Sequence, residues 1–275
     1  MTRARTHATP AARSLRADGL VVGYDGEPVI AGLDLALPSA GVTMIVGGNG
    51  CGKSTLLRAL ARLIRPRGGA VLLDGEPIAR LATKQVARIV GLLPQAPTAP
   101  DGITVSELVD RGRTPHRGGF GRRGAGDDAV VAEALELTGM VEFAERGVDE
   151  LSGGQRQRAW VAMALAQEPD ILLLDEPTTY LDLAHQVELL ELLVRLSRER
   201  GTQVVVVIHE LNLATRYADH LIAMADGAVV AQGRPAEVVT VELVREVFGL
   251  ETVICPDPVA GTPMIVPVGS GGGAA

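Results

Sequence analysis

The sequence predicts an α/β fold built on a parallel sheet, and two apolar runs carry this prediction. Residues 170–174 and 202–208 are almost continuously aliphatic, as expected for strands buried on both faces of a parallel sheet. Between them, aliphatic residues recur at the helical spacing of four, three and four residues: Leu183, Val187, Leu190 and Val194. We therefore predict a β-α-β unit, whose crossover should be right-handed.

The first part of the chain has the pattern of strands followed by a helix. Residues 15–46 are strand-like and include a hairpin with its turn at Asp25-Gly26, which predicts an antiparallel β subdomain at the N-terminus. The run Val42–Val46 ends abruptly in glycines. A helix is predicted over Lys53–Leu63, where leucines recur at helical spacing.

The middle of the chain is mostly helical, and strands return after it. The pattern over residues 105–165 predicts a helical subdomain inserted at about 96–165. Near the C-terminus, Asp226-Gly227 predicts a second hairpin, and Val241–Phe248 predicts a short helix.

Composition narrows the class of protein. The chain has 275 residues, 47% of them hydrophobic but only 3% aromatic, so one large domain with an aliphatic core is expected. Lys and Arg number 26 against 33 Asp and Glu, a net charge of −7 that argues against a nucleic-acid partner. The cysteines Cys51 and Cys255 are too sparse for a disulfide framework or a thiolate metal site, and fit a reducing compartment.

The chain ends and one internal loop are expected to lack regular structure. Residues 1–14 form a basic arm without the apolar core of a secretory signal, and residues 268–275 have the composition of a flexible tail. Residues 117–126 are rich in Gly and Arg and predict a surface loop of unassigned role. Since no apolar run approaches the ~20 residues of a spanning helix, we expect a soluble chain that reaches membranes through a partner.

A glycine-rich segment between the first predicted helix and its strand fits the phosphate-binding pattern G-x-x-x-x-G-K-[ST]. The glycines let backbone N–H groups turn toward phosphate oxygens, and the following helix presents its N-terminal donors to the same anion. Lys53 would reach the β- and γ-phosphates, and the Ser54 hydroxyl would bind Mg²⁺. The pattern predicts a P-loop NTPase core that binds ATP or GTP through these residues: Gly47, Gly48, Asn49, Gly50, Cys51, Gly52, Lys53, Ser54 and Thr55.

Acidic residues after the next buried strand supply the second half of this site. Asp175 follows the apolar run 171–174, where a carboxylate at the strand tip can hold Mg²⁺ beside the phosphates. Glu176, one residue further, is positioned to polarise an attacking water. An exposed acidic turn before Pro177 is the alternative, and the preceding phosphate loop argues against it.

The segment Leu151-Ser-Gly-Gly-Gln155 resembles the signature sequence of ABC ATPases. At average composition this pentapeptide is far rarer by chance than the phosphate-loop pattern. It precedes a predicted helix and so provides a second anion-receptive helix start, although an ordinary glycine-rich helix entry is the alternative. The resemblance implies a RecA-like core and a nucleotide-sandwich homodimer. Four residues would then close on the γ-phosphate held by the other subunit: Ser152, Gly153, Gly154 and Gln155.

The same resemblance implies roles for further residues. Gln95 would sense Mg²⁺ or water and link the core to the helical subdomain, and Asp182 would lie in the loop that crosses the dimer seam. His209 would contact the γ-phosphate, although a lone strand-end histidine is more often structural. Tyr24 matches the aromatic residue that stacks on adenine, whereas hairpin tyrosines are often only packed. The implied catalytic residues are Glu176, His209, Lys53 and Gln95, and the implied metal ligands are Ser54, Gln95 and Asp175.

Three further stretches resemble the ATPase subunits of ferric-siderophore importers, the ferric-enterobactin-like group in particular. They are Arg111–His116, Thr178–Gln186 and Asp257–Pro263. The resemblance covers residues 15–267 and departs at Gly48, where relatives commonly carry proline. It implies an ATPase bound peripherally at the cytoplasmic face of the membrane. That ATPase would drive integral-membrane permease subunits. An extracytoplasmic siderophore-binding protein would deliver the ferric siderophore to the permease.

Other functions remain open from the sequence. The same kind of motor serves haem and cobalamin import, because an ATPase subunit does not touch the cargo. A non-transport ABC ATPase acting on DNA or ribosomes is disfavoured by the acidic balance and by the lack of coiled-coil insertions or a second ATPase domain. A small P-loop kinase would leave residues 151–155 unexplained.

Overall fold

The computed structural model describes residues 13–118, 123–124 and 126–268. Most of the predicted N-terminal arm (residues 1–12), the tail from residue 269 and part of the Gly/Arg-rich loop (residues 119–122 and 125) lie outside these ranges. Arg13 and Ser14, expected within the arm, are held to the domain. Arg13 pairs with Asp74 and Asp170, and the backbone N–H of Ser14 donates to Asp74.

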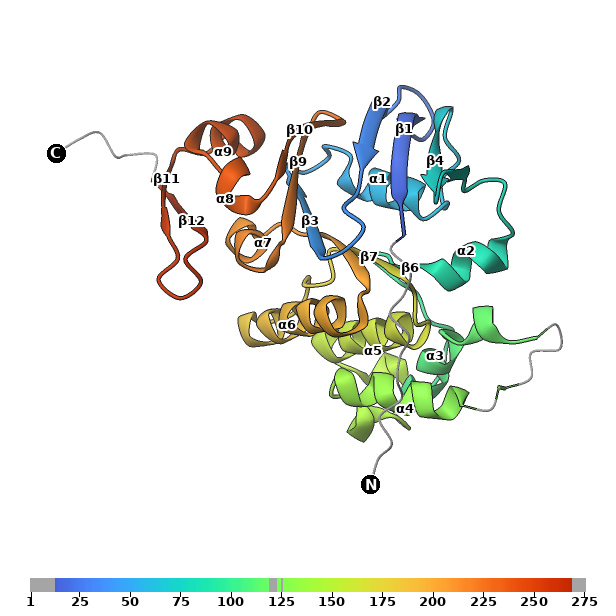
Figure 1. The fold of residues 1–275 in the computed structure, drawn as a ribbon. Coiled ribbons are helices and arrows are strands. Elements are labelled where there is room, and N and C mark those ends of the chain that lie inside the picture. Colours follow the sequence, from blue (N-terminus) through green and yellow to red (C-terminus); the bar gives the residue numbers. More distant parts are fainter. Residues whose placement is uncertain (1–12, 119–122, 125, 269–275) are drawn as a thin grey trace.

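The fold is α/β, as predicted, and the main sheet is mostly parallel (Figure 1). Among the described residues its strand order is β10-β9-β3-β8-β7-β6, with every pair parallel except β10 and β9. The strands are β3 (Val42–Gly47), β6 (Val90–Leu93), β7 (Ile171–Asp175), β8 (Gln203–Val207), β9 (His220–Ala225) and β10 (Ala228–Gly233). The predicted β-α-β unit is β7, α6 (Leu183–Arg200) and β8.

Buried aliphatic residues explain the central position of these strands. Every residue of β3, β7 and β8 is buried. Along β8, Val204 and Val206 belong to one core cluster, and Val205 and Val207 belong to the other. The sheet therefore separates two cores, and this arrangement requires the continuous apolar runs seen in the sequence.

An antiparallel sheet covers one side of the molecule. It consists of β1 (Leu15–Val22), β2 (Ile30–Ala36), β4 (Gly68–Leu73) and β5 (Glu76–Pro77), in the order β2-β1-β4-β5. Helix α1 (Lys53–Leu60) lies between this sheet and the main one (Figure 1). The predicted hairpin of β1 and β2 is confirmed, but residues 23–29 connect the strands where a two-residue turn was predicted.

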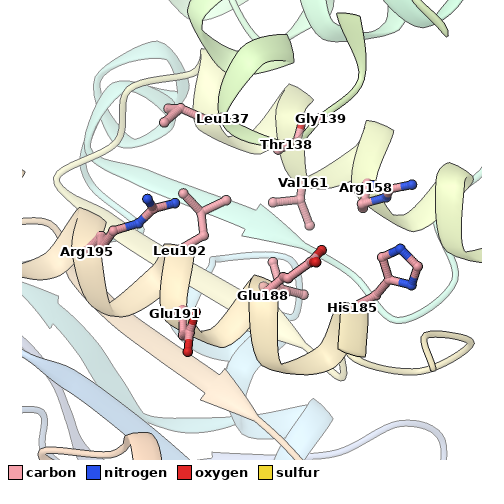
Figure 2. A pocket seen from close by; sticks show the side chains of 11 residues that line it. Leu137, Thr138, Gly139, Arg158, Val161, His185, Glu188, Glu191, Leu192 and Arg195 are labelled. Atoms are coloured by element: carbon pink, nitrogen blue, oxygen red, sulfur yellow. The ribbon is translucent and has the colours of Figure 1, made fainter. Parts of the chain in front are cut away.

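The helical subdomain packs on the opposite side of the main sheet. It contains α3 (Val105–Arg111), α4 (Asp127–Leu137) and α5 (Gly153–Ala166), with the short turns η1 (Thr114–His116), η2 (Val141–Phe143) and η3 (Val148–Glu150). Helix α2 (Thr83–Ile89) precedes β6. A cavity of about 310 Å³ lies between the end of α4, α5 and α6, and Figure 2 shows Arg158 and Glu188 among the side chains that line it.

The C-terminal part adds elements to the far edge of the sheet. The predicted turn at Asp226-Gly227 connects β9 and β10, and the predicted helix α9 spans Val241–Phe248. Helices α7 (Leu211–Tyr217) and α8 (Pro235–Val238) lie nearby, and a hairpin of β11 (Thr252–Pro256) and β12 (Pro263–Pro267) ends the described chain (Figure 1). This last hairpin was not predicted.

Helix α1 is shorter than its leucine pattern predicted. It ends at Leu60, and Leu63 is 65% exposed rather than part of the apolar face. Arg62 adopts a left-handed backbone (φ 62°) and donates to the carbonyls of Ala79 and Leu81. Contacts with the following segment thus end the helix before the pattern does. Within the described ranges, no helix is long and apolar enough to cross a membrane.

Candidate functional site

The glycine-rich loop between β3 and α1 surrounds the ammonium group of Lys53. This buried lysine donates to the carbonyl oxygens of Gly47 (2.9 Å) and Gly48 (2.8 Å). At Gly47 a Cβ atom would lie 2.3 Å from the carbonyl oxygen of Met224, so only glycine fits there. Gly52 has φ 101° at the N-cap of α1, a backbone conformation that lets the loop turn into the helix.

Ser54 and Asp175 meet beneath this loop. The Ser54 hydroxyl donates to Oδ1 of Asp175 (2.8 Å). Burial raises the pKa of the Asp175 carboxyl, and the hydrogen bond from Ser54 acts in the opposite direction. The other carboxylate oxygen, Oδ2, is buried and has no hydrogen-bond partner among the described residues. An unsatisfied carboxylate oxygen beside a hydroxyl is the donor set that Mg²⁺ prefers, so these residues fit the predicted metal.

Three side chains surround the carboxylate of Glu176, and its backbone is strained. Its backbone has φ 53°, in the left-handed region that costs a non-glycine residue free energy. Gln95 donates to its Oε2 (2.7 Å), Thr179 lies 3.4 Å from the same oxygen, and Nε2 of His209 lies 2.5 Å from Oε1. The strain and the converging partners fix the carboxylate at one position.

Lys53, Ser54 and Glu176 face one cavity of about 560 Å³, and Asp175 is buried behind Ser54. The cavity brings together residues from the loop before β2, the phosphate loop, the end of β6 and the ends of β7 and β8. It is lined by Tyr24, Val29, Asn49, Gly50, Gly52, Lys53, Ser54, Thr55, Gln95, Glu176 and His209. Most of the predicted nucleotide-binding and catalytic residues therefore converge on one open space at the carboxyl end of the parallel strands. This is where ligands of open α/β sheets bind.

Tyr24 lies at the edge of this cavity and is 51% exposed. Its hydroxyl accepts a hydrogen bond from Nη1 of Arg58 (3.0 Å). Nη2 of the same Arg58 lies 4.0 Å from Oδ2 of Asp175. The aromatic ring is therefore available at the rim, as adenine stacking would require.

The signature residues lie outside this cavity. Ser152 begins α5 with a capping box, in which its hydroxyl accepts from the N–H of Gln155 (3.3 Å) and the Gln155 side chain accepts from the N–H of Ser152 (3.0 Å). The Ser152 hydroxyl keeps its own proton free to donate. Asp182 likewise caps α6, accepting from the N–H and ring of His185. Within one subunit, these residues do not complete the Lys53 site.

Three cavity neighbours escaped the sequence analysis: Val29, Arg58 and Thr179. Arg58 carried a usable signal, because it lies four residues after Ser54 and so occupies the same face of α1. Thr179 follows Glu176 by three residues in a turn, where its N–H donates to the Glu176 carbonyl. Val29 is placed by the long connection between β1 and β2, and sequence offers no equivalent signal.

Comparison with known proteins agrees with this geometry. A family model described as ABC transporter matches residues 30–179. The Ferric enterobactin transport ATP-binding protein FepC of Escherichia coli (strain K12) is 53% identical over 261 residues, covering 95% of this chain and 96% of the relative. The Probable siderophore transport system ATP-binding protein YusV of Bacillus subtilis (strain 168) is 50% identical over 258 residues, covering 94% of each chain.

Solved structures give the same assignment. An ABC transporter in an inward-facing conformation superposes with a TM-score of 0.80 at 28% identity, covering 94% of this chain and 98% of that one. The dimeric structure of MJ0796, a bacterial ABC transporter cassette, superposes with a TM-score of 0.71 at 29% identity, covering 80% and 98%. The P-loop core, the added antiparallel sheet and the close relatives agree, and the chain belongs to the ABC transporter family as an ATP-binding subunit.

Proposed function

We propose that this chain hydrolyses ATP to drive the import of ferric siderophores through a separate membrane permease. The observation that carries the ATPase assignment is the convergence of Lys53, Ser54 and Glu176 on one cavity, with the buried Asp175 bonded to Ser54 behind its wall. The cargo assignment is supported by relatives at 50% identity or more that are named for siderophore and ferric enterobactin transport.

The phosphate loop would exchange its internal hydrogen bonds for bonds to the nucleotide. In the structure, Lys53 uses its donors on the carbonyls of Gly47 and Gly48. A triphosphate in the cavity would offer charged acceptors, which form stronger hydrogen bonds with an ammonium group than carbonyl oxygens do. The N–H groups at the start of α1 would donate to the same anion.

Ser54, Asp175 and Gln95 would hold Mg²⁺. When bound, the ion would neutralise charge that develops on the phosphoryl oxygens. Asp175 supplies a buried carboxylate oxygen that is otherwise unsatisfied, and Ser54 supplies the neighbouring hydroxyl. Gln95 reaches the same region through its bond to Glu176.

Glu176 would orient and polarise the water that attacks the γ-phosphate. Its carboxylate is fixed by Gln95 and His209, so both oxygens have defined directions. His209 is 42% exposed at the cavity and can reach a terminal phosphate as well as Glu176. The pair would thereby link the presence of the γ-phosphate to the position of the base.

A second copy of the chain would complete each site. Ser152 to Gln155 lie outside the Lys53 cavity but present a helix start with a free hydroxyl proton, which suits a phosphate bound to the partner. Asp182, at the start of α6, would lie at the seam between the subunits. ATP would then form part of the interface, so dimerisation and nucleotide binding would be linked.

The membrane role would depend on other subunits. We infer that the chain binds an integral-membrane permease at the cytoplasmic face, and that an extracytoplasmic binding protein delivers the cargo on the other side. Movement of the helical subdomain relative to the core, hinged near Gln95, would transmit the closure of the dimer.

The Glu176→Gln variant tests the catalytic assignment. It should bind ATP and dimerise with it, but turnover should fall by about 100-fold or more, because the amide cannot polarise water as a carboxylate does. Phosphate release and light scattering with ATP would measure the two properties. Glu246→Gln, on the exposed face of α9, is the matched control. Hydrolysis by Glu176→Gln at the wild-type rate would remove Glu176 from the mechanism.

A further inference from the structure

The C-terminal hairpin is fastened to α7 by one side chain. Asn212 donates from Nδ2 to the carbonyl oxygen of Ile265 (3.1 Å) and accepts at Oδ1 from the N–H of the same residue (2.7 Å). The amide group thus pairs with both backbone groups of one β12 residue, as a neighbouring strand would. Both residues of this contact lie outside the phosphate loop and the signature segment.

Asn212 lies three residues after His209, in the first turn of α7. On one side of His209, the N–H of Ile208 is bonded to the carbonyl of Ile45 in the main sheet (3.1 Å). At the far end of α7, Asp219 is bonded to Val42 through its backbone N–H and its side chain. The first turn of α7 follows His209 directly, and the Asn212 side chain connects this turn to β12.

The hairpin is itself well anchored, so it can serve as a fixed support. Ile265 is only 5% exposed and belongs to the main core cluster, and Ile254 packs against the same cluster. Arg216, one turn after Asn212, lies 3.8 Å from Asp257 in the hairpin loop. Since an isolated hairpin is marginally stable in water, these contacts with the domain fix its position.

We propose that Asn212 is a positioning residue for His209: it locks the first turn of α7 to the C-terminal hairpin and so holds the imidazole against Glu176. The proposal rests on the proposed function only in giving His209 a role in turnover. The C-terminal hairpin would thereby support the site, although Ile265 lies 56 residues after His209 in the sequence.

The expected effect is specific because the Asn212 side chain lies outside the nucleotide cavity and bonds backbone atoms of Ile265 rather than filling the core. Asn212 is not among the residues that line the cavity, and it is exposed at the surface. Its loss should leave ATP affinity intact and relax the position of His209. Small displacements of catalytic groups cost large factors in rate, so turnover should fall by about tenfold while the KM for ATP changes by less than about twofold.

The test compares Asn212→Ala and Asn212→Asp with wild type and with Arg245→Gln. The Asp variant keeps the acceptor for the Ile265 N–H but places an oxygen against the Ile265 carbonyl, so it should lose as much turnover as Ala. Arg245→Gln breaks an exposed ion pair with Glu251 at the entry to the same hairpin and should behave as wild type. Unchanged kcat in both Asn212 variants would overturn the proposal.

A second measurement does not depend on hydrolysis. The ring nitrogen resonances of His209, assigned with a His209→Gln variant in isotope-labelled full-length chain, report its bond to Glu176. In Asn212→Ala they should move toward the values of Glu176→Gln, and in Arg245→Gln they should stay at wild-type values. Resonances unmoved by Asn212→Ala would refute the positioning role. Resonances that move while wild type hydrolyses no ATP would uphold it and refute the proposed function instead.

Discussion

At the scale of single residues, the candidate site holds a buried lysine and a buried carboxylate, which suit a phosphate and Mg²⁺. Lys53 is bonded to loop carbonyls, and Oδ2 of Asp175 is buried without a hydrogen bond among the described residues. A buried unsatisfied carboxylate oxygen costs free energy that a bound cation would recover. We therefore expect Asp175 to respond to the metal and Lys53 to the phosphates.

The Asp175→Asn variant separates these two roles. It should lose most of the effect of Mg²⁺ on ATP affinity, about tenfold or more, because it replaces a charged ligand with a neutral one. Affinity for ATP without Mg²⁺ should stay near wild type. Titration of a fluorescent ATP analogue, with and without Mg²⁺, measures both values. Asp128→Asn, at an 82% exposed aspartate, is the control; an intact Mg²⁺ effect in Asp175→Asn would contradict the assignment.

Residue identities in the site were largely predictable, but their partners were not. The spacing of the phosphate loop identified Lys53 and Ser54, and the strand before Asp175 placed it near them. The bond from Arg58 to Tyr24 joins residues 34 apart and depends on where the β1–β2 connection folds back. Such a tie leaves no periodic signal in the sequence.

At the scale of elements, ionic contacts fix helices that periodicity could only predict. Arg113, just after α3, donates to Asp127 at the start of α4 (3.0 Å) and to Glu168 after α5 (2.8 Å). Arg113 and Asp127 are 7% and 5% exposed. Burial raises the pKa of Asp127, but hydrogen bonds from the Gly124 N–H, Arg113 and Arg117 outweigh it and lower the pKa to about 2. Arg113 therefore connects α3, α4 and the end of α5.

The Asp127→Asn variant should destabilise the domain by about 2 kcal/mol at neutral pH, because it removes a buried charged acceptor. Since the folded-state pKa lies below the ordinary value of 3.8, the stabilisation is complete above that value and is lost as pH falls toward about 2. Urea unfolding from neutral pH down to the acid limit of folding measures the free energy of unfolding of wild type and of Asp127→Asn. The difference in free energy between the two proteins should narrow below about pH 4. A difference that stays constant with pH would show that the Asp127 charge is not responsible.

Element boundaries show where local pattern yields to tertiary contact. Leucine spacing extended α1 to Leu63, whereas Arg62 turns out of the helix to bond the segment before α2. The short strands β11 and β12 begin or end at prolines, which cannot donate to a ladder, and so they resemble loops in sequence. By contrast, the β7-α6-β8 unit has continuous apolar runs, and its three elements were predicted apart from their ends.

At the scale of the whole molecule, one subunit carries two separate surfaces that would form a single site across the proposed dimer. The Lys53 cavity and the Ser152 helix start are separate surfaces of the described chain. The core and its inserted helical subdomain also meet across the cavity lined by Arg158 and Glu188 (Figure 2). These features suit a motor in which nucleotide draws two copies together and the helical subdomains transmit the movement.

Uptake of radiolabelled iron–siderophore by iron-starved cells tests whether this chain drives ferric-siderophore import. Cells that lack this gene and any backup importer would be rescued with wild type or with Lys53→Ala, which removes the phosphate-binding ammonium group. Uptake should be lost on deletion and restored by wild type alone. Uptake that persists in the deleted cells would contradict siderophore import and direct the search to haem or cobalamin as the cargo.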